Sequence, residues 1–240
     1  MPAELRLRDT LRKLGGAALM GDPAAGIAPA VLNRLAAEIG EAVALGAKIG
    51  VVTGGGNFVR GLAFAAGGGN RVAGDQMGML GTGMNSIALN EALARKGVDS
   101  RLFSSTPMPT FCEPFNQPRA QRAFDEGKVV IFAGGTGNPF FTTDTAGALR
   151  AAEMGCDAPF KGTQVDGIYS ADPKRDASAV RYDRLTHDEV LAKGLQVMDA
   201  AAVALARDNG IPVIVFSILE AGSLVAVVRG EGRSTVVADR

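Results

Sequence analysis

The charged residues of this sequence that could carry chemistry are two lysines, an arginine and three aspartates. They are Lys13, Lys161, Arg60, Asp75, Asp144 and Asp199, and each lysine stands at the end of a predicted strand. Phosphoryl transfer requires a protein mainly to position its reactants and to place positive charge where negative charge shifts. Two lysines beside free backbone N–H groups meet that requirement. For either lysine alone, a solvated strand end is an equally good interpretation.

The segment Gly134–Asp144, which reads GGTGNPFFTTD, has the composition of an anion-binding loop. It joins the apolar run Val129–Ala133, a predicted buried strand, to a predicted helix over 145–154. Threonine hydroxyls and free N–H groups at a helix start can point at a phosphate, and glycines let the backbone approach closely. An ordinary strand-to-helix connection also uses glycine and a capping threonine, so the loop favours a ligand site only moderately.

Several other chemistries lack their residues. There is no GxxxxGK[ST] motif, which excludes a P-loop, and no GxGxxG opens a helix after the first strand, which disfavours dinucleotide binding. A Ser-His-Asp system would need the single histidine, His187, which lies inside a capping sequence and is predicted to start a helix. The two cysteines, Cys112 and Cys156, lie far apart and in no CxxC arrangement, which suggests neither a disulfide framework nor a zinc site.

The composition favours a single domain over residues 1–240 that stays in the cytoplasm. A chain of 240 residues can bury a large core, and neither a linker-like segment nor an internal repeat indicates a second domain. The 25 basic and 25 acidic residues give a net charge of +0, which offers no support for a nucleic-acid partner. The charged start of the chain and the lack of an apolar run of about 18 residues predict no export signal and no membrane partner.

Apolar runs that alternate with helical patterns predict an α/β fold, a three-layer α/β/α sandwich around a mainly parallel central sheet. Leu5–Leu14 alternates leucines with charged residues, which predicts a half-exposed strand. The other predicted strands are 49–52, 100–104, 129–133, 157–162 and 211–216, and the predicted helices are 29–45, 77–96, 118–126, 145–154, 186–194 and one ending over 203–209. A hairpin is predicted for 226–228 and 235–237.

Three glycine-bearing loops follow predicted strands. They are Gly15–Gly16, Gly54–Gly56 and Gly134–Gly137. In parallel sheets ligands bind beyond the carboxyl ends of the strands, so we expect all three loops to lie at one ligand-binding edge.

A resemblance to a known family is carried by the segments 54–61, 70–80, 135–144, 165–173 and 197–199. Together they are similar to the bacterial uridylate kinases, which have the amino-acid kinase fold and are unrelated to P-loop nucleoside monophosphate kinases. The likeness runs nearly end to end, and TGNPFFTT over Thr136–Thr143 is highly specific. It implies transfer of the γ-phosphoryl group of ATP to UMP, giving UDP in pyrimidine nucleotide synthesis, with no covalent enzyme intermediate.

The resemblance also implies a role for each matching residue. Lys13 and Lys161 would neutralise the transferring phosphoryl group, and Asp144 and Asp199 would orient the two lysines. The UMP-binding residues, with Asp75 near the sugar and Arg60 on the phosphate, would be Gly55, Arg60, Asp75, Thr136, Gly137, Asn138, Pro139, Phe140, Phe141, Thr142 and Thr143. The ATP-binding residues, with Tyr169 and Asp172 toward the adenosine, would be Lys13, Leu14, Gly15, Gly16, Gly56, Thr163, Tyr169 and Asp172.

The same resemblance implies partners and an ion. Mg²⁺ would ride on the nucleotide phosphates, so no residue is predicted as a metal ligand. Family members are typically homohexamers, often activated by GTP and inhibited by UTP. Asn90–Glu91 stands where many members have Arg-Asp, which makes the response to GTP doubtful.

The sequence departs from the family pattern mainly on the ATP side. The family's Lys-Leu-Ser-Gly-Glu is here Lys13–Ala17, KLGGA, and Pro159–Phe160 places a residue without an N–H in a predicted central strand. An alternative is therefore a noncatalytic relative that binds or stores an anion, as molybdenum-storage relatives do, or that regulates. The presence of Lys13, Lys161, Asp144 and Asp199 argues against that alternative.

Overall fold

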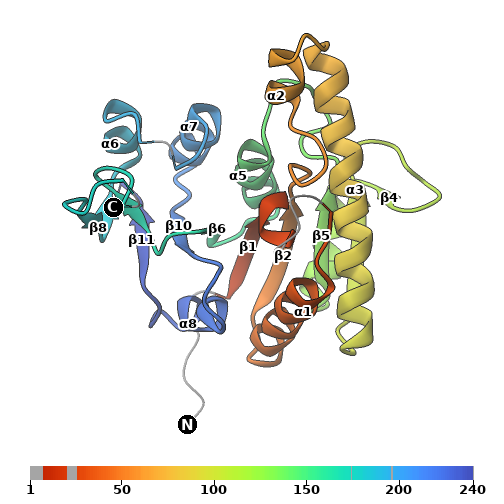
Figure 1. Ribbon diagram of the computed structural model, residues 1–240. Helices are drawn as coiled ribbons and strands as arrows, with labels where there is room; N and C mark the ends of the chain where they lie inside the picture. The colour runs from red at the N-terminus through yellow and green to blue at the C-terminus, as the bar shows by residue number, and fades with distance from the viewer. Residues whose placement is uncertain (1–7, 21–25, 174, 196, 240) are drawn as a thin grey trace.

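The computed structural model describes residues 8–20, 26–173, 175–195 and 197–239. Its main strands are β1 (Asp9–Leu14), β2 (Lys48–Thr53), β3 (Ser100–Ser104), β4 (Glu113–Pro114), β5 (Val129–Ala133), β6 (Ala158–Thr163), β9 (Arg184–Leu185), β10 (Val213–Ser217) and β11 (Ser234–Val237). Within the described residues these strands form one sheet in the order β4-β3-β5-β2-β1-β6-β10-β11-β9 (Figure 1). Every neighbouring pair is parallel except β10 with β11. The predicted mainly parallel sheet is confirmed.

Helices cover both faces of the sheet. They are α1 (Pro29–Ala44), α2 (Gly61–Ala66), α3 (Arg71–Arg95), α4 (Gln117–Asp125), α5 (Thr143–Glu153), α6 (His187–Ala192), α7 (Ala200–Asp208) and α8 (Ser223–Val228), with a 3-10 turn η1 (Gly16–Leu19) after β1. A two-stranded ribbon, β7 (Ile168–Tyr169) with β8 (Arg181–Tyr182), stands apart. One core lies between the sheet and α1, α3 and α8, and a second lies beneath α4 and α5. A third cluster packs α6 and α7 against β10 and β11 (Figure 1). The three-layer fold is confirmed.

The predicted hairpin at the end of the chain is wrong. Residues 226–228 belong to α8, and β11 pairs antiparallel with β10 instead. The run Leu224–Val228 is apolar without alternation, so a short helix can bury four of its side chains in the core formed with α1 and the sheet. The sequence also missed α2 and the first turn of α3, which Asn70 caps through its side chain, 3.1 Å from Ala73 N.

The prediction of a half-exposed first strand is also wrong. β1 lies in the middle of the sheet between β2 and β6, and Thr10 and Arg12 are 1% and 0% exposed. The part of that prediction over residues 5–7 lies outside the described residues. The charged positions of the alternation predict a solvent-exposed face, but α1 covers that face. The Arg12 guanidinium lies 5.6 Å from the Phe216 ring and 3.9 Å from the Glu38 carboxylate. Burial lowers the Arg12 pKa to about 10 against the opposing pull of Glu38.

We expect Arg12→Met to raise the free energy of unfolding by roughly 1–2 kcal/mol, since apolar replacement of poorly paired buried charge is often stabilising. Among the described residues none of the three Arg12 side-chain nitrogens has a hydrogen-bond partner, whereas Glu38 also pairs with Arg34 at 2.7 Å and would keep that partner after the change. Urea unfolding of both proteins measures the difference. A lower free energy of unfolding in the variant would show that the interactions of Arg12 with Glu38 and Phe216 stabilise the core.

Pro159 stands in a central strand, as the sequence predicts. β6 lies between β1 and β10, with Pro159 opposite Leu11 of β1, and pairing with β10 begins only at Phe160. The residue without an N–H therefore sits where β6 has a partner on one side, which limits the number of ladder bonds it removes.

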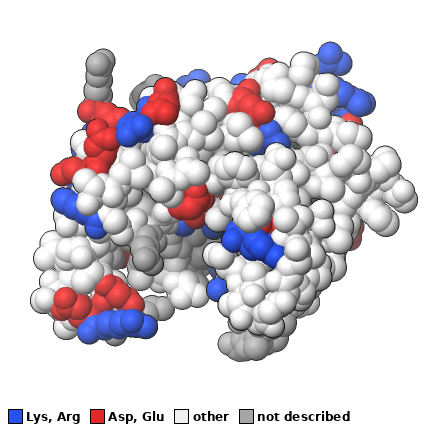
Figure 2. Space-filling model, turned by 90° about the horizontal axis from the view of Figure 1, so that it is seen from above, with Lys and Arg blue, Asp and Glu red and all other residues white. Residues whose placement is uncertain are grey.

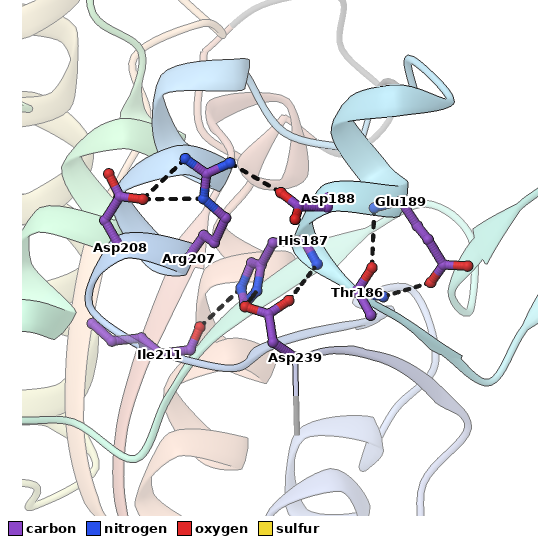
Figure 3. Close-up of polar contacts among 8 residues, drawn as sticks. All are labelled: Thr186, His187, Asp188, Glu189, Arg207, Asp208, Ile211 and Asp239. Atoms are coloured by element: carbon purple, nitrogen blue, oxygen red, sulfur yellow. Dashed lines mark hydrogen bonds and ion pairs between the residues drawn. The ribbon is translucent and has the colours of Figure 1, made fainter.

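His187 starts α6, as predicted, and Figure 3 shows its surroundings. The capping box is confirmed, with Thr186 N 2.8 Å from Glu189 Oε2 and Glu189 N 3.1 Å from Thr186 Oγ1. The imidazole is 1% exposed, and its Nδ1 and Nε2 lie 3.0 Å from Asp239 Oδ2 and 3.1 Å from the Ile211 carbonyl. This histidine therefore ties the end of the chain to α6 and to the approach of β10.

Candidate active site

Lys13 and Lys161 meet at the carboxyl edge of the sheet because their strands are neighbours. They are paired with each other in the register of β1 and β6, so their side chains leave the sheet on the same face. Asp144, in the first turn of α5, lies between them, with Oδ1 2.9 Å from Lys13 Nζ and Oδ2 2.7 Å from Lys161 Nζ. Lys161 Nζ also donates to the Val197 carbonyl. One carboxylate thus joins two ammonium groups.

The charge state of this cluster follows from its partial burial. The three side chains are only 13–17% exposed. Burial opposes ionisation of Asp144, but the two ammonium groups outweigh it and hold its pKa below the ordinary 3.8. Burial lowers the pKa of Lys161, and the Asp144 charge offsets this only in part. With both lysines protonated and Asp144 ionised, the cluster carries one net positive charge, which favours binding of an anion next to it.

We expect Asp144→Asn to lower the free energy of unfolding by roughly 2–3 kcal/mol at pH 6, because two partly buried ammonium groups lose their counter-charge. A carboxylate whose pKa is depressed on folding stabilises the protein above its unfolded pKa, and this contribution is lost as the pH falls through the folded value. The gap between wild type and variant should therefore narrow below pH 3.8. Urea unfolding at a series of pH values tests this, and a gap that is constant with pH would contradict it.

Asp199 lies at the start of α7, whereas Asp144 lies between the two lysines. It caps α7, where Oδ1 lies 2.9 Å from Ala202 N, and it accepts hydrogen bonds from the hydroxyls of Thr142 and Thr145. Thr142 in turn caps α5 through Asp144 N at 3.0 Å. Asp199 therefore fastens α7 to the helix start that carries Asp144, and its described hydrogen bonds reach the lysines only through that helix.

A cavity of about 480 Å³ opens on one side of this cluster, between α2, α3 and the loop 134–142. Eight of the predicted UMP-binding residues line it: Gly55, Arg60, Asp75, Thr136, Asn138, Phe141, Thr142 and Thr143. The other three do not line it: Gly137 packs on Ser105, Pro139 is half-buried and Phe140 is 65% exposed. Figure 2, a view from above, shows a hollowed surface with lysine or arginine and aspartate or glutamate side chains around it.

Gly55 explains how the glycine turn after β2 reaches this cavity. A Cβ on Gly55 would lie 2.1 Å from the Gly78 carbonyl oxygen of α3, a distance that no side chain tolerates. The absence of a side chain lets the turn lie directly on the helix, so the cavity wall is formed by backbone.

The residues of the cavity wall that sequence reasoning missed include Arg71, Met79 and Thr82. Thr82 of α3 joins the loop after β5 to the end of β2, because its Oγ1 accepts the Gly134 N–H at 2.7 Å and its carbonyl accepts the Thr53 hydroxyl at 3.1 Å. Arg71 lies 2.9 Å from Asp75 Oδ2 through its Nε. The four-residue spacing of Arg71 and Asp75 was visible in the sequence, but the predicted helix began at residue 77, which hid it.

A second cavity, of about 670 Å³, opens on the other side of Lys161. Four predicted ATP-binding or catalytic residues line it, namely Lys161, Thr163, Tyr169 and Asp172. Tyr169 donates its hydroxyl hydrogen to Asp166 at 2.6 Å. The same cavity is lined by Lys193–Leu195 and Val197, which follow α6 and which sequence reasoning did not assign to a site, although 197–199 is one of the segments that resemble the family.

Of the remaining predicted ATP-binding residues, Lys13, Leu14, Gly15 and Gly16 lie where β1 passes into η1. Gly56 follows β2 instead and lines the 480 Å³ cavity, on the side predicted for UMP. Leu14 is fully buried in the core, so only its backbone faces the edge. A Cβ on Gly16 would lie 2.6 Å from Gly56 N, and Gly54 N donates to the Leu14 carbonyl at 2.7 Å. The first two glycine loops are thus in contact, and Thr82 ties the third to the end of β2. The prediction that the three loops share one edge is confirmed.

The arrangement fits a reaction between two bound phosphate compounds. Two cavities flank a paired-lysine cluster, which lies at the carboxyl edge of a parallel sheet. Positive charge is held there before any ligand arrives, as transfer of a charged group requires.

Known proteins resemble this chain over nearly its full length. A family model described as "Amino acid kinase family" matches residues 10–217. Curated proteins named uridylate kinase are 58% identical in Chelativorans sp. (strain BNC1), covering 98% of this chain and 95% of that protein, and 60% identical in Brucella abortus, covering 95% of each. The crystal structure of UMP kinase from Bacillus anthracis superposes with a TM-score of 0.93 at 38% identity, covering 97% of this chain and 96% of that one.

Proposed function

This chain belongs to the amino acid kinase family, and from that membership we propose that it transfers the γ-phosphoryl group of ATP to UMP, giving UDP. The observation that carries the proposal is the carboxylate of Asp144, which bridges Lys13 and Lys161 between two cavities. UMP is proposed as the acceptor because the relatives are named uridylate kinase. The reaction would belong to pyrimidine nucleotide synthesis.

In this proposal each cavity takes one nucleotide. UMP would occupy the cavity of Gly55, Arg60 and the loop 136–143, and ATP the cavity of Thr163, Tyr169 and Asp172, with its phosphates over Gly15–Gly16. The lysines would neutralise the phosphoryl group in flight, and Asp144 would keep both ammonium groups aimed at it. No side chain need bond covalently to the phosphorus, because the acceptor phosphate is itself the nucleophile.

We propose that Mg²⁺ reaches the site on the ATP phosphates. Among the described residues no three His, Cys, Asp or Glu side chains gather as a metal-ligand group. The donor set of this edge, ammonium groups and backbone N–H groups, suits phosphate oxygens rather than a cation. The ion would supply further neutralisation of the phosphate charge.

We also propose a domain organisation, a location and an assembly for this chain. Residues 1–240 would act as one domain in the cytoplasm, assembled as a homohexamer, with GTP and UTP as possible effectors. In the part of the chain that the structure describes, no helix has the length and apolarity to cross a membrane. A noncatalytic, anion-storing or regulatory relative is not favoured, because the relatives at 58% and 60% identity are named uridylate kinases.

A coupled assay of ADP release, with ATP and magnesium, tests the proposal. UMP, CMP and dUMP are offered in turn, and turnover is expected with UMP as the best acceptor. Folded protein that turns over none of the three would refute an enzymatic function and revive the anion-binding alternative.

A further inference from the structure

Arg71 is a charged residue of the acceptor cavity to which neither the motifs nor the loop composition assigned a role. It is the first residue of α3, and its side chain is 26% exposed. Its Nε donates to both carboxylate oxygens of Asp75, at 3.0 and 2.9 Å, and its guanidinium lies 5.4 Å from the centre of the Phe140 ring. Arg71 therefore contacts both the helix and the loop that border the cavity.

The contacts of Arg71 and Asp75 hold the backbone of Phe140 in an unusual conformation. Its φ is 71°, and among the described residues other than glycine it is the one with a positive φ. A residue with a Cβ rarely adopts this left-handed conformation, so the surroundings must hold it. Two contacts do so: the Phe140 N–H donates to Asp75 Oδ2 at 2.7 Å, and the Arg71 guanidinium covers the exposed ring.

The carboxylate of Asp75 is oriented by the same residues. It is 11% exposed, and a Cβ on Gly61 would lie 1.9 Å from its Oδ1, so the start of α2 encloses it. Arg71 and Phe140 occupy three of its roughly four acceptor positions. One position is left for a donor in the cavity, such as a hydroxyl of a bound nucleoside.

We propose that Arg71 is a positioning residue of the acceptor site: it fixes the Asp75 carboxylate and, through Phe140, the left-handed turn of the loop 134–144 over the bound nucleotide. The part of this proposal that concerns UMP rests on the proposed function. Arg71 acts through Asp75 and Phe140, so its effect falls on acceptor affinity rather than on the phosphoryl-transfer step. A lysine would not replace it, because an ammonium group lacks the planar face that stacks on a ring and the fixed geometry of Nε.

The matched control is Arg95, which lies at the other end of α3. It also forms a four-residue ion pair, with Glu91 at 3.5 Å, but is 54% exposed and lines neither cavity. The variants Arg71→Met, Arg71→Lys and Arg95→Met therefore remove or change the same kind of pair on the same helix, and only the first two touch the acceptor site.

We expect Arg71→Met and Arg71→Lys to raise the Kd and KM for UMP roughly ten- to hundredfold, as loss of a charge-assisted hydrogen bond does. The KM for ATP should stay within about twofold and the Tm within about 3 °C, as for loss of a partly exposed pair. Arg95→Met should change none of these. Equal rises in both KM values, a large fall in Tm, or full rescue by lysine would overturn the positioning role.

A reporter that needs no nucleotide separates this inference from the proposed function. The chain has no tryptophan, so Phe141→Trp places a single fluorophore in the loop. In that background, Arg71→Met should raise acrylamide quenching about twofold, because a loosened loop exposes the indole, and Arg95→Met should not. Unchanged quenching would overturn the role of Arg71 in the loop even if the enzyme is active. A wild type without UMP turnover would instead refute the proposed function and leave the quenching result to decide for Arg71.

Discussion

Substituting Lys161 with alanine should lower kcat roughly 10²- to 10³-fold while leaving the Kd for UMP nearly unchanged, as loss of a preorganised charge at the reacting group does. Lys161 lines the donor cavity and shares the carboxylate of Asp144 with Lys13. Its charge is proposed to act on the phosphoryl group as that group passes from ATP to UMP, whereas UMP is proposed to bind in the other cavity, whose lining residues do not include Lys161. The measurements are steady-state turnover with ATP and calorimetric titration of UMP.

The control for this prediction is Lys48→Ala. Lys48 begins β2 at the amino edge of the sheet, where it pairs with Asp125 at 3.3 Å, far from the glycine loops. It is also a lysine on a central strand, so it controls for the loss of a strand ammonium group. Its substitution should leave kcat intact. If Lys161→Ala weakened UMP binding as much as it lowered turnover, Lys161 would be a structural residue and the catalytic assignment would fail.

Placing a methyl group on Gly16 is the second change for which we expect a large effect. Its Cβ would lie 2.5–2.8 Å from Asn57 Oδ1, Gly56 N and Asn57 N, so the turn after β1 could no longer rest on the turn after β2. Overpacking of this kind costs roughly 1–3 kcal/mol of stability. Because the ATP phosphates are proposed to lie over this turn, we expect Gly16→Ala to raise the KM for ATP more than tenfold, the equivalent of about 1.4 kcal/mol.

Gly15 offers a matched control one residue away. An added Cβ there meets nothing closer than Lys13 Nζ, at 3.7 Å, and the backbone at Gly15 has φ of −62°, which any residue can adopt. Gly15→Ala should therefore leave the urea midpoint nearly unchanged, so it controls for the loss of stability expected of Gly16→Ala. Similar losses in the two variants would mean that flexibility of the turn, rather than its contact with Gly56 and Asn57, is what the glycines provide.

Local patterns in the sequence were sufficient to predict most of the framework. Continuous apolar runs predicted β5 and β10, and the Thr186–Glu189 spacing predicted the capping box of α6. The glycine and threonine content of the loop 134–144 predicted a connection between a strand and a helix, and this loop joins β5 to α5. Each of these signals depends on residues that are neighbours in sequence and interact as neighbours, which is why one chain is enough to detect them.

The failures involve residues whose partners are distant in sequence. The alternation of β1 suggested a solvent-exposed face, but Arg12 is buried because α1 packs over that face. The apolar run Leu224–Val228 suits strand or helix equally, and contact with α1 decided for α8. In both cases tertiary packing decided what the local pattern did not specify: which face of β1 is covered, and whether an apolar run forms a strand or a helix.

The sequence by itself determined that this chain forms a mainly parallel α/β sheet, that glycine turns follow its strands, and that two lysines end two of them. Only the tertiary structure decided that those lysines are register partners joined by one carboxylate, and that Arg71 lines the 480 Å³ cavity. The reason is physical: secondary structure follows from interactions over a few residues, whereas a binding site forms where strands and helices from distant parts of the chain converge.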